Sequence, residues 1–320
     1  MAEYIIPGQA MSFYQIGWRD EQQDARFPDD DFPPEGSRTF IVCDGVGGQE
    51  GGAIASSTVC RAFADFMGGY ANPAYEFTQS DFRQAITFAY QRLLKAIAQC
   101  NETDMATTLT FLHINADNAL VAHMGDSRVY HIRPGAGILY RSTDHSLVNV
   151  LVHSGRISPE QAINHPEGNV ITRSMSYAEP GAEPSAADVI VLTDIEAGDY
   201  FMLCTDGVIS QIDDQYLVDL LSSSASDEDK MRNLAQICRN ASDNNTATLV
   251  RIQDAPRVAS AAGDTMANEE IEAVKPSIPS ATPSQTCLLD APAPEMERVA
   301  PDNALPLHRK VAGRLRDLFT

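Results

Sequence analysis

Apolar residues recur at helical spacing in two early stretches of the chain. They lie three and four residues apart between residues 53 and 67, and again throughout residues 78–100. This spacing collects the apolar side chains on one face of a helix. We therefore predict two amphipathic helices that lie against a sheet, with further helices over residues 146–154, 214–222 and 228–241.

Short apolar runs bounded by turn residues predict β-strands around these helices. The middle of the chain holds four such runs joined by polar or glycine-containing turns, which is typical of an antiparallel meander. The residues from Met11 to Ile16 alternate loosely, as in a strand that leads to a polar turn. The other predicted strands are residues 40–43, 109–114, 118–123, 129–133, 138–141, 189–192, 200–204 and 247–252.

The composition changes near residue 254, which divides the chain into three predicted parts. A domain over residues 1–254 is followed by residues 255–306, where eight prolines and no periodicity predict a disordered linker. Residues 307–320 place apolar side chains on one helical face among basic ones. We expect a short amphipathic tail helix that docks on a protein partner or an anionic membrane surface, with a frayed tail as the alternative.

The charge balance is strongly acidic, with 44 acidic and 23 basic residues and a net charge of −21. Residues 255–320 contain nine acids and seven bases, so most of the negative charge lies in the predicted domain. Binding of nucleic acid requires a basic surface, and this balance argues against it. An acidic surface mainly serves solubility, although some carboxylates are available for a cation site.

The cysteines indicate a reducing compartment. They form no C-x-x-C pair and no disulfide framework, and three of them (Cys43, Cys60 and Cys204) fall within apolar strands or helices. Buried free thiols are the expected state of such cysteines. The first residues lack a leader pattern, and no apolar run approaches the length of about 18 residues needed to span a membrane. We therefore expect a soluble, cytoplasmic protein.

A glycine-rich stretch carries the first candidate for chemistry. Asp44 ends a predicted buried strand, and five glycines occur among the next eight residues. Glycine permits a sharp turn or a close approach to the backbone, and a carboxylate in such a place suits Mg²⁺ or Mn²⁺. Asp126, Asp206 and Asp243 also lie next to apolar runs. Strands paired in a sheet would bring these distant carboxylates together.

Several other catalytic motifs are missing from the sequence. The glycines do not satisfy the G-x-G-x-x-G dinucleotide pattern, and no Gly-Lys-Ser/Thr marks a phosphate-binding loop. There is no G-x-S-x-G nucleophile elbow and no His-Glu-x-x-His zinc motif. Among seven histidines only His145 has a suggestive setting, and a lone histidine is more often a packed or surface residue.

Eight short motifs occur between about residues 10 and 253. In chain order they are Gly17-Trp-Arg19 with Asp24, Asp44-Gly-Val-Gly-Gly48 with Gly51-Gly52, Thr107-Thr108, Gly125-Asp-Ser-Arg128, Asp144-His-Ser146, Asn169-Val-Ile-Thr-Arg173, Asp206-Gly207 and Asp243-Asn-Asn-Thr246. Each is weak alone, but the ordered set resembles the metal-dependent serine/threonine protein phosphatases of type 2C, the PPM family, in its bacterial form.

This resemblance implies an α+β fold, a four-layer α-β-β-α sandwich of two mostly antiparallel sheets flanked by helices. It implies a monomer that hydrolyses phosphoserine and phosphothreonine in proteins and reverses a cognate serine/threonine kinase. Arg19 would grip the phosphoryl group, since a guanidinium suits phosphate better than an ammonium does. A metal-activated water would be the nucleophile, so a reactive Cys or Ser motif is not required.

The resemblance also assigns ligands for two Mn²⁺ or Mg²⁺ ions at one end of the sheets. Asp44 would bridge both ions and act in catalysis with Arg19. Asp206 and Asp243 would complete the shell of the first ion. The Gly45 carbonyl would help to hold the second ion, with Asp24 supporting it through water.

Two further features follow from the same resemblance. Asp126, together with Asp206, would hold a third and weaker ion. Residues 144–184 match the flap beside the family's active site, and we expect them to help choose substrates. The flap residues in the matching motifs are Asp144, His145, Asn169 and Arg173.

Three positions depart from the family pattern. Gln23 stands where many members have a glutamate, which removes one charge near the second ion. Val46 replaces a histidine that animal members use as a proposed general acid, so another group or water must protonate the leaving group. Ala106 replaces a glycine before the paired threonines, which is a minor change.

Two other function classes compete with the phosphatase. One is a catalytically impaired relative of the same fold that only binds phosphoproteins, which a missing metal aspartate would mark. Asp44, Asp206 and Asp243 are all present. The other is an acidic scaffold with Ca²⁺-binding Asp-Gly turns, but the chain lacks the tight D-x-[DN]-x-[DN]-G loop.

Overall fold

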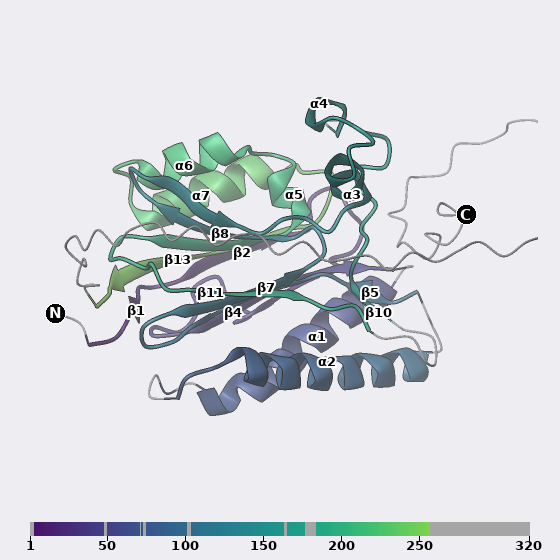
Figure 1. The fold of residues 1–320 in the computed structure, drawn as a ribbon, viewed down its shortest axis with the longest axis horizontal. Helices are drawn as coiled ribbons and strands as arrows, with labels where there is room; N and C mark the ends of the chain where they lie inside the picture. Colours follow the sequence, from purple (N-terminus) through teal and green to yellow (C-terminus); the bar gives the residue numbers. More distant parts are fainter. Residues whose placement is uncertain are drawn as a thin grey trace, which may run out of the picture. The chain divides into compact units, whose positions relative to one another are not determined.

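The computed structural model describes residues 3–47, 50–70, 72, 75–100, 104–162, 165–176 and 184–256. Nearly all of the predicted linker (255–306) and the whole predicted tail helix (307–320) lie outside these residues, so both stay predictions. The described part has four layers, in which two sheets pack face to face and helices cover both outer faces (Figure 1). The expected α-β-β-α sandwich is thus confirmed.

The first sheet has six strands, and every pairing in it is antiparallel. Its order is β1-β13-β12-β8-β9, with β2 also paired to β13. The long strand β13 pairs with β12 over five consecutive residues without a change of register. The strands are β1 (Ile6–Pro7), β2 (Met11–Gln15), β8 (Arg128–Arg133), β9 (Gly137–Arg141), β12 (Tyr200–Cys204) and β13 (Asn245–Asp254).

The second sheet has seven strands and is also antiparallel throughout. Its order is β10-β5-β4-β6-β7-β11, and β3 pairs with β4. Because β4 has three partners along its length, it organises this sheet. The strands are β3 (Asp24–Phe27), β4 (Thr39–Val46), β5 (Ala106–Thr107), β6 (Leu109–Ile114), β7 (Ala119–Met124), β10 (Met175–Ser176) and β11 (Asp188–Leu192).

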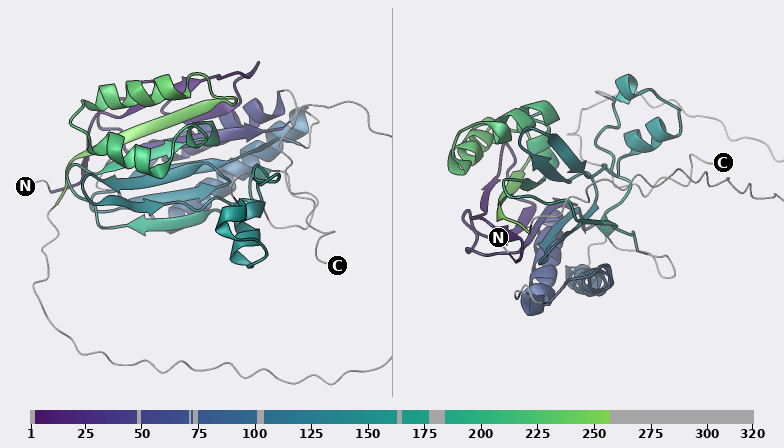
Figure 2. Two further views of the ribbon diagram at one scale, coloured as in Figure 1. Left: turned by 90° about the horizontal axis from the view of Figure 1, so that it is seen from above. Right: turned by 60° about the vertical axis from the view of Figure 1, so that its left-hand side comes forward.

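The helices divide between the two outer faces and one end of the sandwich. Helices α1 (Gly51–Met67) and α2 (Gln79–Cys100) cover the second sheet, and α6 (Asp214–Ser222) and α7 (Asp227–Cys238) cover the first (Figures 1 and 2). Helices α3 (Leu147–His153) and α4 (Pro159–Ala162) lie at the end where β5 and β10 are found (Figure 1). The shorter helices are η1 (Gly68–Tyr70) and α5 (Asp206–Ile209).

Three buried apolar clusters hold the layers together. Phe40, Val42 and Leu112 of the second sheet meet Phe201 and Leu203 of the first in the middle layer. A second cluster lies between the second sheet and α1 and α2, and a third between the first sheet and α6 and α7. Strands β6, β7 and β12 are buried along their whole length. Such burial on both faces explains their nearly continuous apolar runs.

The predicted elements agree closely with the structure, with one informative difference. The strand predicted over residues 40–43 extends to Val46, because β3 and β5 pair with its second half. Asp44 therefore lies inside a strand rather than after it. None of the helices in the described part of the chain combines the length and apolar character of a membrane span.

Candidate functional site: an aspartate cluster at one end of the sandwich

Asp24 and Asp44 lie directly opposite each other on β3 and β4. Both are buried, with 3% and 6% of their surface exposed. Asp24 Oδ2 accepts hydrogen bonds from the Thr205 hydroxyl at 3.1 Å and the Thr246 hydroxyl at 2.7 Å. Thr205 directly precedes Asp206, and Thr246 ends the motif that begins at Asp243. One carboxylate thus connects three of the predicted motifs across both sheets.

The surroundings of Asp24 favour a cation. Burial, reinforced by the Asp44 carboxylate, raises the pKa of Asp24 well above its usual value. Its Oδ1 atom is buried and accepts no hydrogen bond from the described residues. A buried, unbonded carboxylate oxygen is costly, and a hard divalent cation would satisfy it. The residues present therefore fit the metal that the sequence predicts.

Thr108 joins Asp44 to the loop that carries Asp126. Its hydroxyl accepts a hydrogen bond from the Asp44 N–H at 2.9 Å and lies 2.8 Å from the Ser127 hydroxyl. The Thr108 N–H donates in turn to the Asp44 carbonyl at 2.9 Å. Thr107 also donates to this carbonyl, at 3.0 Å. The paired threonines fix the backbone on which two predicted metal ligands stand.

Gly45 sits where three segments meet at close range. Its N–H donates to the Gln23 carbonyl at 3.0 Å. A Cβ atom at Gly45 would lie 2.2 Å from the Gly52 carbonyl oxygen at the start of α1 and 2.4 Å from that of Gln23. Only glycine allows this approach. Part of the glycine-rich stretch therefore serves to bring β3, β4 and α1 together beside Asp44.

Arg19 reaches the cluster from a loop at its edge. Its Nη2 atom donates to Asp243 Oδ2 at 2.8 Å, and 44% of the Arg19 side chain remains exposed. The adjoining Asn244 is buried, and its side chain amide donates to the carbonyls of Ile16 and Glu21 at 2.8 and 3.0 Å. The loop thus holds Arg19 at the solvent side of the aspartates, where a phosphoryl group could approach it.

Within the predicted flap, Ser146 and Ile171 lie next to this cluster. Ser146 and Ile171 form an antiparallel bridge, and the Leu147 N–H donates to the Val170 carbonyl at 2.8 Å. Ile171 packs with Val46 and Ala106 in a small buried cluster. Two of the positions that depart from the family pattern therefore lie under the base of the flap.

The predicted flap residues do different things in the structure. Asp144 forms a two-pronged ion pair with Arg128, with both distances at 2.7 Å, so it fixes the flap to β8. His145 is buried, and its Nδ1 atom accepts a hydrogen bond from the Gly125 N–H at 3.1 Å. Arg173 is exposed and pairs with Asp188, while Asn169 is exposed in the loop. Asp144, His145 and Arg173 thus anchor the flap.

His145 belongs to a second cluster, which includes His123 and Asp188. The imidazoles of His123 and His145 stack with their centroids 4.6 Å apart, and His145 Nε2 lies 3.1 Å from Asp188 Oδ2. Ligand atoms of the three residues lie within 4.8 Å of one another. However, Arg173 Nη1 lies 2.8 Å from Asp188 Oδ1 and 3.2 Å from His145 Nε2.

The Arg173 guanidinium thus already occupies the place of a cation in this second cluster. In addition, the imidazole rings of His123 and His145 are nearly parallel, so their nitrogen lone pairs cannot both point at one metal ion. Burial lowers the pKa of His145, and Arg173 adds to this against the opposing effect of Asp188. Arg173 and His145 in turn outweigh the effect of burial and lower the pKa of Asp188. We interpret the cluster as a structural contact that holds the flap against β11.

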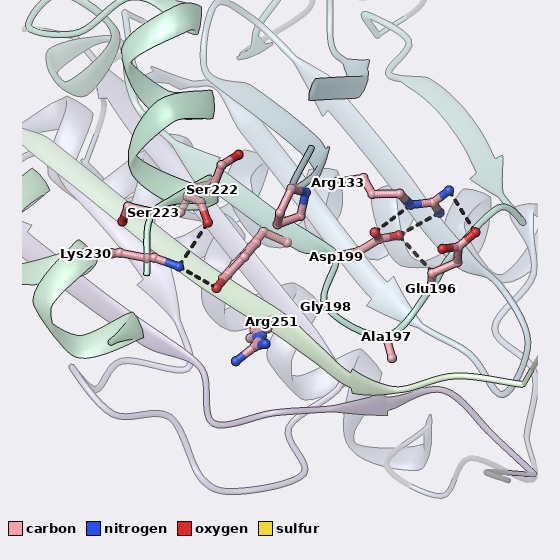
Figure 3. Close-up of a pocket in the computed structure, with 12 residues that line it drawn as sticks. Arg133, Glu196, Ala197, Gly198, Asp199, Ser222, Ser223, Lys230 and Arg251 are labelled. Atoms are coloured by element: carbon pink, nitrogen blue, oxygen red, sulfur yellow. Dashed lines mark hydrogen bonds and ion pairs between the residues drawn. The ribbon is translucent and has the colours of Figure 1, made fainter. Parts of the chain in front are cut away.

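One cavity at the other end of the sandwich does not carry comparable chemistry. It has a volume of about 340 Å³ and lies where β12 begins and β8 ends (Figure 3). Its three cationic side chains are all paired. Arg133 bonds to Asp199, Lys230 donates to the Tyr200 hydroxyl at 2.9 Å, and Arg251 lies 3.7 Å from Asp227. We therefore place the functional site at the aspartate cluster.

Sequence reasoning identified the aspartates but missed the residues that position them. Asn244 and Thr246 lie within the Asp243–Thr246 motif and Thr205 directly precedes Asp206, but no positioning role was predicted for any of the three. His123 and Asp188 gave no signal, because their relation to His145 depends on the pairing of β7 with β11. The buried cysteines Cys43, Cys60 and Cys204 are free thiols, as expected.

An oxygen-rich cluster of buried aspartates with an arginine at its edge defines a site of the kind found in metal-dependent hydrolases. Residues 21–252 match the family described as "Protein phosphatase 2C". The chain belongs to the protein phosphatase 2C family. It is similar to the protein phosphatase PhpP of Streptococcus pneumoniae, with 32% identity over 225 residues that cover 68% of this chain and 87% of PhpP.

Solved structures agree with this assignment. PppA, described as a key regulatory component of T6SS in Pseudomonas aeruginosa, is 28% identical, with a TM-score of 0.63 and coverage of 78% of this chain and 99% of PppA. The catalytic domain of the phosphatase PstP, solved with two manganese ions, is 22% identical, with a TM-score of 0.60 and coverage of 77% and 98%. At this identity the likeness to PstP concerns the fold.

Proposed function

We propose that this protein is a Mn²⁺- or Mg²⁺-dependent phosphatase that hydrolyses phosphoserine and phosphothreonine in proteins. The observation that carries the proposal is the position of Asp24. It faces Asp44 across β3 and β4 and bonds to the threonines beside the Asp206 and Asp243 motifs. Family membership supports the reaction class, and the retained aspartates give no support to a protein that only binds phosphoproteins.

The metal ligands that we propose are the aspartates of the cluster. Asp44 would contribute to holding both ions, Asp206 and Asp243 would hold the first, and the Gly45 carbonyl and Asp24 would serve the second. When bound, such ions lower the pKa of a water and offset charge on the phosphoryl oxygens. Asp126 directly precedes Ser127, whose hydroxyl lies 2.8 Å from that of Thr108, and it would hold a third and weaker ion together with Asp206.

The chain's own residues position the phosphoryl group and limit access to it. Arg19 offers a planar guanidinium at the solvent side of the cluster, where it can bind two phosphoryl oxygens at once. Asp243 orients this guanidinium before substrate arrives. The flap residues between Ser146 and Ile171 stand beside the entrance and contact the protein part of the substrate. Positioning and electrostatics of this kind dominate catalysis of phosphoryl transfer.

The proposal extends to the substrates, the oligomeric state and the cellular location of the enzyme. The substrates are phosphoproteins made by a cognate serine/threonine kinase, and the enzyme acts on them as a monomer in the cytoplasm. The acidic composition gives no basis for binding to nucleic acid. The basic tail, residues 307–320, docks on a protein partner or a membrane surface.

Release of phosphate from a phosphothreonine peptide tests the proposal. Wild-type protein should turn over with Mn²⁺ and stop with a chelator. Asp206→Asn should lose at least about 100-fold in kcat, because one ligand loses its charge. The matched control is Asp219→Asn on the exposed face of α6, whose carboxylate accepts a hydrogen bond from Gln215 at 2.8 Å. Folded wild-type protein that binds Mn²⁺ but never releases phosphate would instead indicate the binding-only alternative.

A further inference from the structure

Trp18 is the single tryptophan of the chain, and it stands directly before Arg19. Its surface is 75% exposed, the largest value among the exposed large hydrophobic residues of the described part. An indole left in water forgoes a large amount of hydrophobic burial. Tyr75 and Phe32 are also exposed, at 61% and 56%, but neither adjoins a candidate catalytic residue. Packing within the protein does not explain the position of Trp18.

The backbone around Trp18 is held firmly. The Trp18 N–H donates to the Ala241 carbonyl at 3.0 Å. The Asn244 side chain amide donates to the carbonyls of Ile16 and Glu21, which lie before and after Trp18 in the loop. Gly17 adopts a φ of +62°, and a Cβ there would lie 2.2 Å from the Asp243 carbonyl oxygen. A side chain at that position is therefore excluded, and the loop rests tightly on residues 241–243. The indole is presented on a rigid support, which lowers the entropic cost of binding.

The charges beside Trp18 select the chemistry of a partner. Asp20 and Glu21 follow in the same loop and are exposed. Neither carboxylate forms a hydrogen bond or ion pair with another described residue. Among aromatic side chains, the face of an indole attracts a cation most strongly. An exposed indole next to two unpaired carboxylates is complementary to a lysine or, better, to a planar arginine.

We propose that Trp18 is a specificity residue that stacks on a basic side chain flanking the phosphoresidue of the substrate. This inference rests on the proposed function, since it takes Arg19 as the group that grips phosphate. Consecutive residues of an extended peptide advance by about 3.3 Å. The loop residue next to Arg19 therefore faces substrate residues within about three positions of the phosphoresidue. Asp20 and Glu21 add attraction for the same positive charge.

Paired peptides test the proposal. Two phosphothreonine peptides should differ only at one flanking residue, arginine in one and glutamine in the other. We expect wild-type enzyme with Mn²⁺ to prefer the arginine peptide in kcat/KM. Trp18→Ala should reduce this preference about tenfold, and Trp18→Phe should reduce it less, because benzene binds cations more weakly than indole. Tyr75→Ala removes another exposed aromatic side chain and should leave the preference unchanged.

The single tryptophan allows a second measurement. Titration of the Asp206→Asn variant with each peptide should change the indole emission, at lower concentration for the arginine peptide. An unchanged preference in Trp18→Ala, or an emission that ignores both peptides, would overturn the inference. A shift of Trp18→Ala from dimer to monomer with unchanged preference would assign the indole to a self-interface instead.

A failure of the proposed function would look different from a failure of this inference. Neither the wild-type protein nor the variants at position 18 would then hydrolyse the peptides or p-nitrophenyl phosphate. The emission titration would still show whether Trp18 binds the basic peptide.

Discussion

Arg19 donates a hydrogen bond of 2.8 Å to Asp243, although the two residues stand 224 positions apart in the chain. Both side chains are partly exposed, so the pair contributes little to stability. Its value lies in orientation, because it joins the proposed phosphate-binding arginine to a proposed metal ligand. The loop before β3 and the turn before β13 thus act as one unit.

We predict that Arg19→Lys impairs catalysis without unfolding the protein. Lysine keeps the charge but loses the planar pair of donors that fits a phosphoryl group. We expect kcat/KM for a phosphothreonine peptide to fall about 10- to 100-fold, which corresponds to about 1.4 to 3 kcal/mol of transition-state stabilisation. Steady-state kinetics with Mn²⁺ measures this loss, and thermal unfolding shows whether the fold is intact.

The matched control for this change is Arg92→Lys. Arg92 also forms an exposed pair with an aspartate, Asp65, at 3.3 Å, but it lies on α2 under the second sheet. It should retain wild-type kinetics. Equal losses in the two variants would show that the effect of Arg19→Lys is not specific to the site.

Thr108 offers a test of how the fold holds the site. Thr108→Val keeps the shape of the side chain but leaves the buried Asp44 N–H without its partner at 2.9 Å. We expect a loss of about 1–3 kcal/mol in the free energy of unfolding, together with weaker Mn²⁺ activation, because Asp44 is less well positioned. Urea unfolding and a Mn²⁺ titration of activity measure the two effects.

Thr110→Val separates these two effects. Thr110 lies two residues further along the chain, on β6, and is equally buried, but its hydroxyl donates to the Val42 carbonyl, away from the aspartates. It should lose stability and retain the wild-type dependence on Mn²⁺. If both variants shifted the Mn²⁺ dependence alike, the role of Thr108 in positioning Asp44 would be wrong.

The long elements of the fold could be predicted because their physics is local. The apolar stripes of α1 and α2 repeat often enough to define a period, and the apolar runs of β6, β7 and β12 are five or six residues long. Strands β3, β5 and β10 have two to four residues each and offer no period to read. They exist because β4 and its neighbours supply hydrogen-bond partners, which is information about the whole sheet.

In the candidate site, too, some residues carry a local signal in the sequence and others do not. Asp44 and Asp206 are marked by the glycines that follow them and by the order of motifs along the chain. The contacts of Thr205 and Thr246 with Asp24 depend on a close approach between two sheets. No local pattern encodes that approach, since threonine is an ordinary strand residue. Sequence therefore predicts the ligands, and only the structure identified the groups that hold the proposed ligands in place.

His113 should make the protein sensitive to acid. Burial, with a smaller contribution from Arg38, lowers the pKa of His113 to about 4. The unfolded chain therefore binds a proton at higher pH than the folded protein does, and stability falls as the pH drops from about 6.5 towards 4. At pH 5 this one group should cost about 2 kcal/mol relative to pH 8.

Urea unfolding between pH 4.5 and pH 8 measures this dependence. His113→Gln should be less stable than wild type at pH 8, since it disturbs the contact with Thr39, but its stability should fall less on acidification. Parallel curves for the two proteins would mean that His113 does not contribute to acid sensitivity.

A backbone hydrogen bond closes the base of the flap. Residues 148–169 leave and rejoin the body between Leu147 and Val170, which are already joined by a hydrogen bond of 2.8 Å. A two-residue Asn-Gly turn can therefore replace them, because such turns connect adjacent antiparallel strands. The deletion leaves the Arg128–Asp144 ion pair and the contact of Arg173 with Asp188 in place.

If the flap selects substrates, this deletion should change the ranking of a phosphopeptide panel by about tenfold in kcat/KM. Hydrolysis of p-nitrophenyl phosphate should stay within about threefold of wild type, because Arg19 and the aspartates lie outside the deleted segment. The separation between the two assays is the critical result. Equal loss on peptides and on the small substrate would mean that the flap supports the site as a whole and does not read the protein part of the substrate.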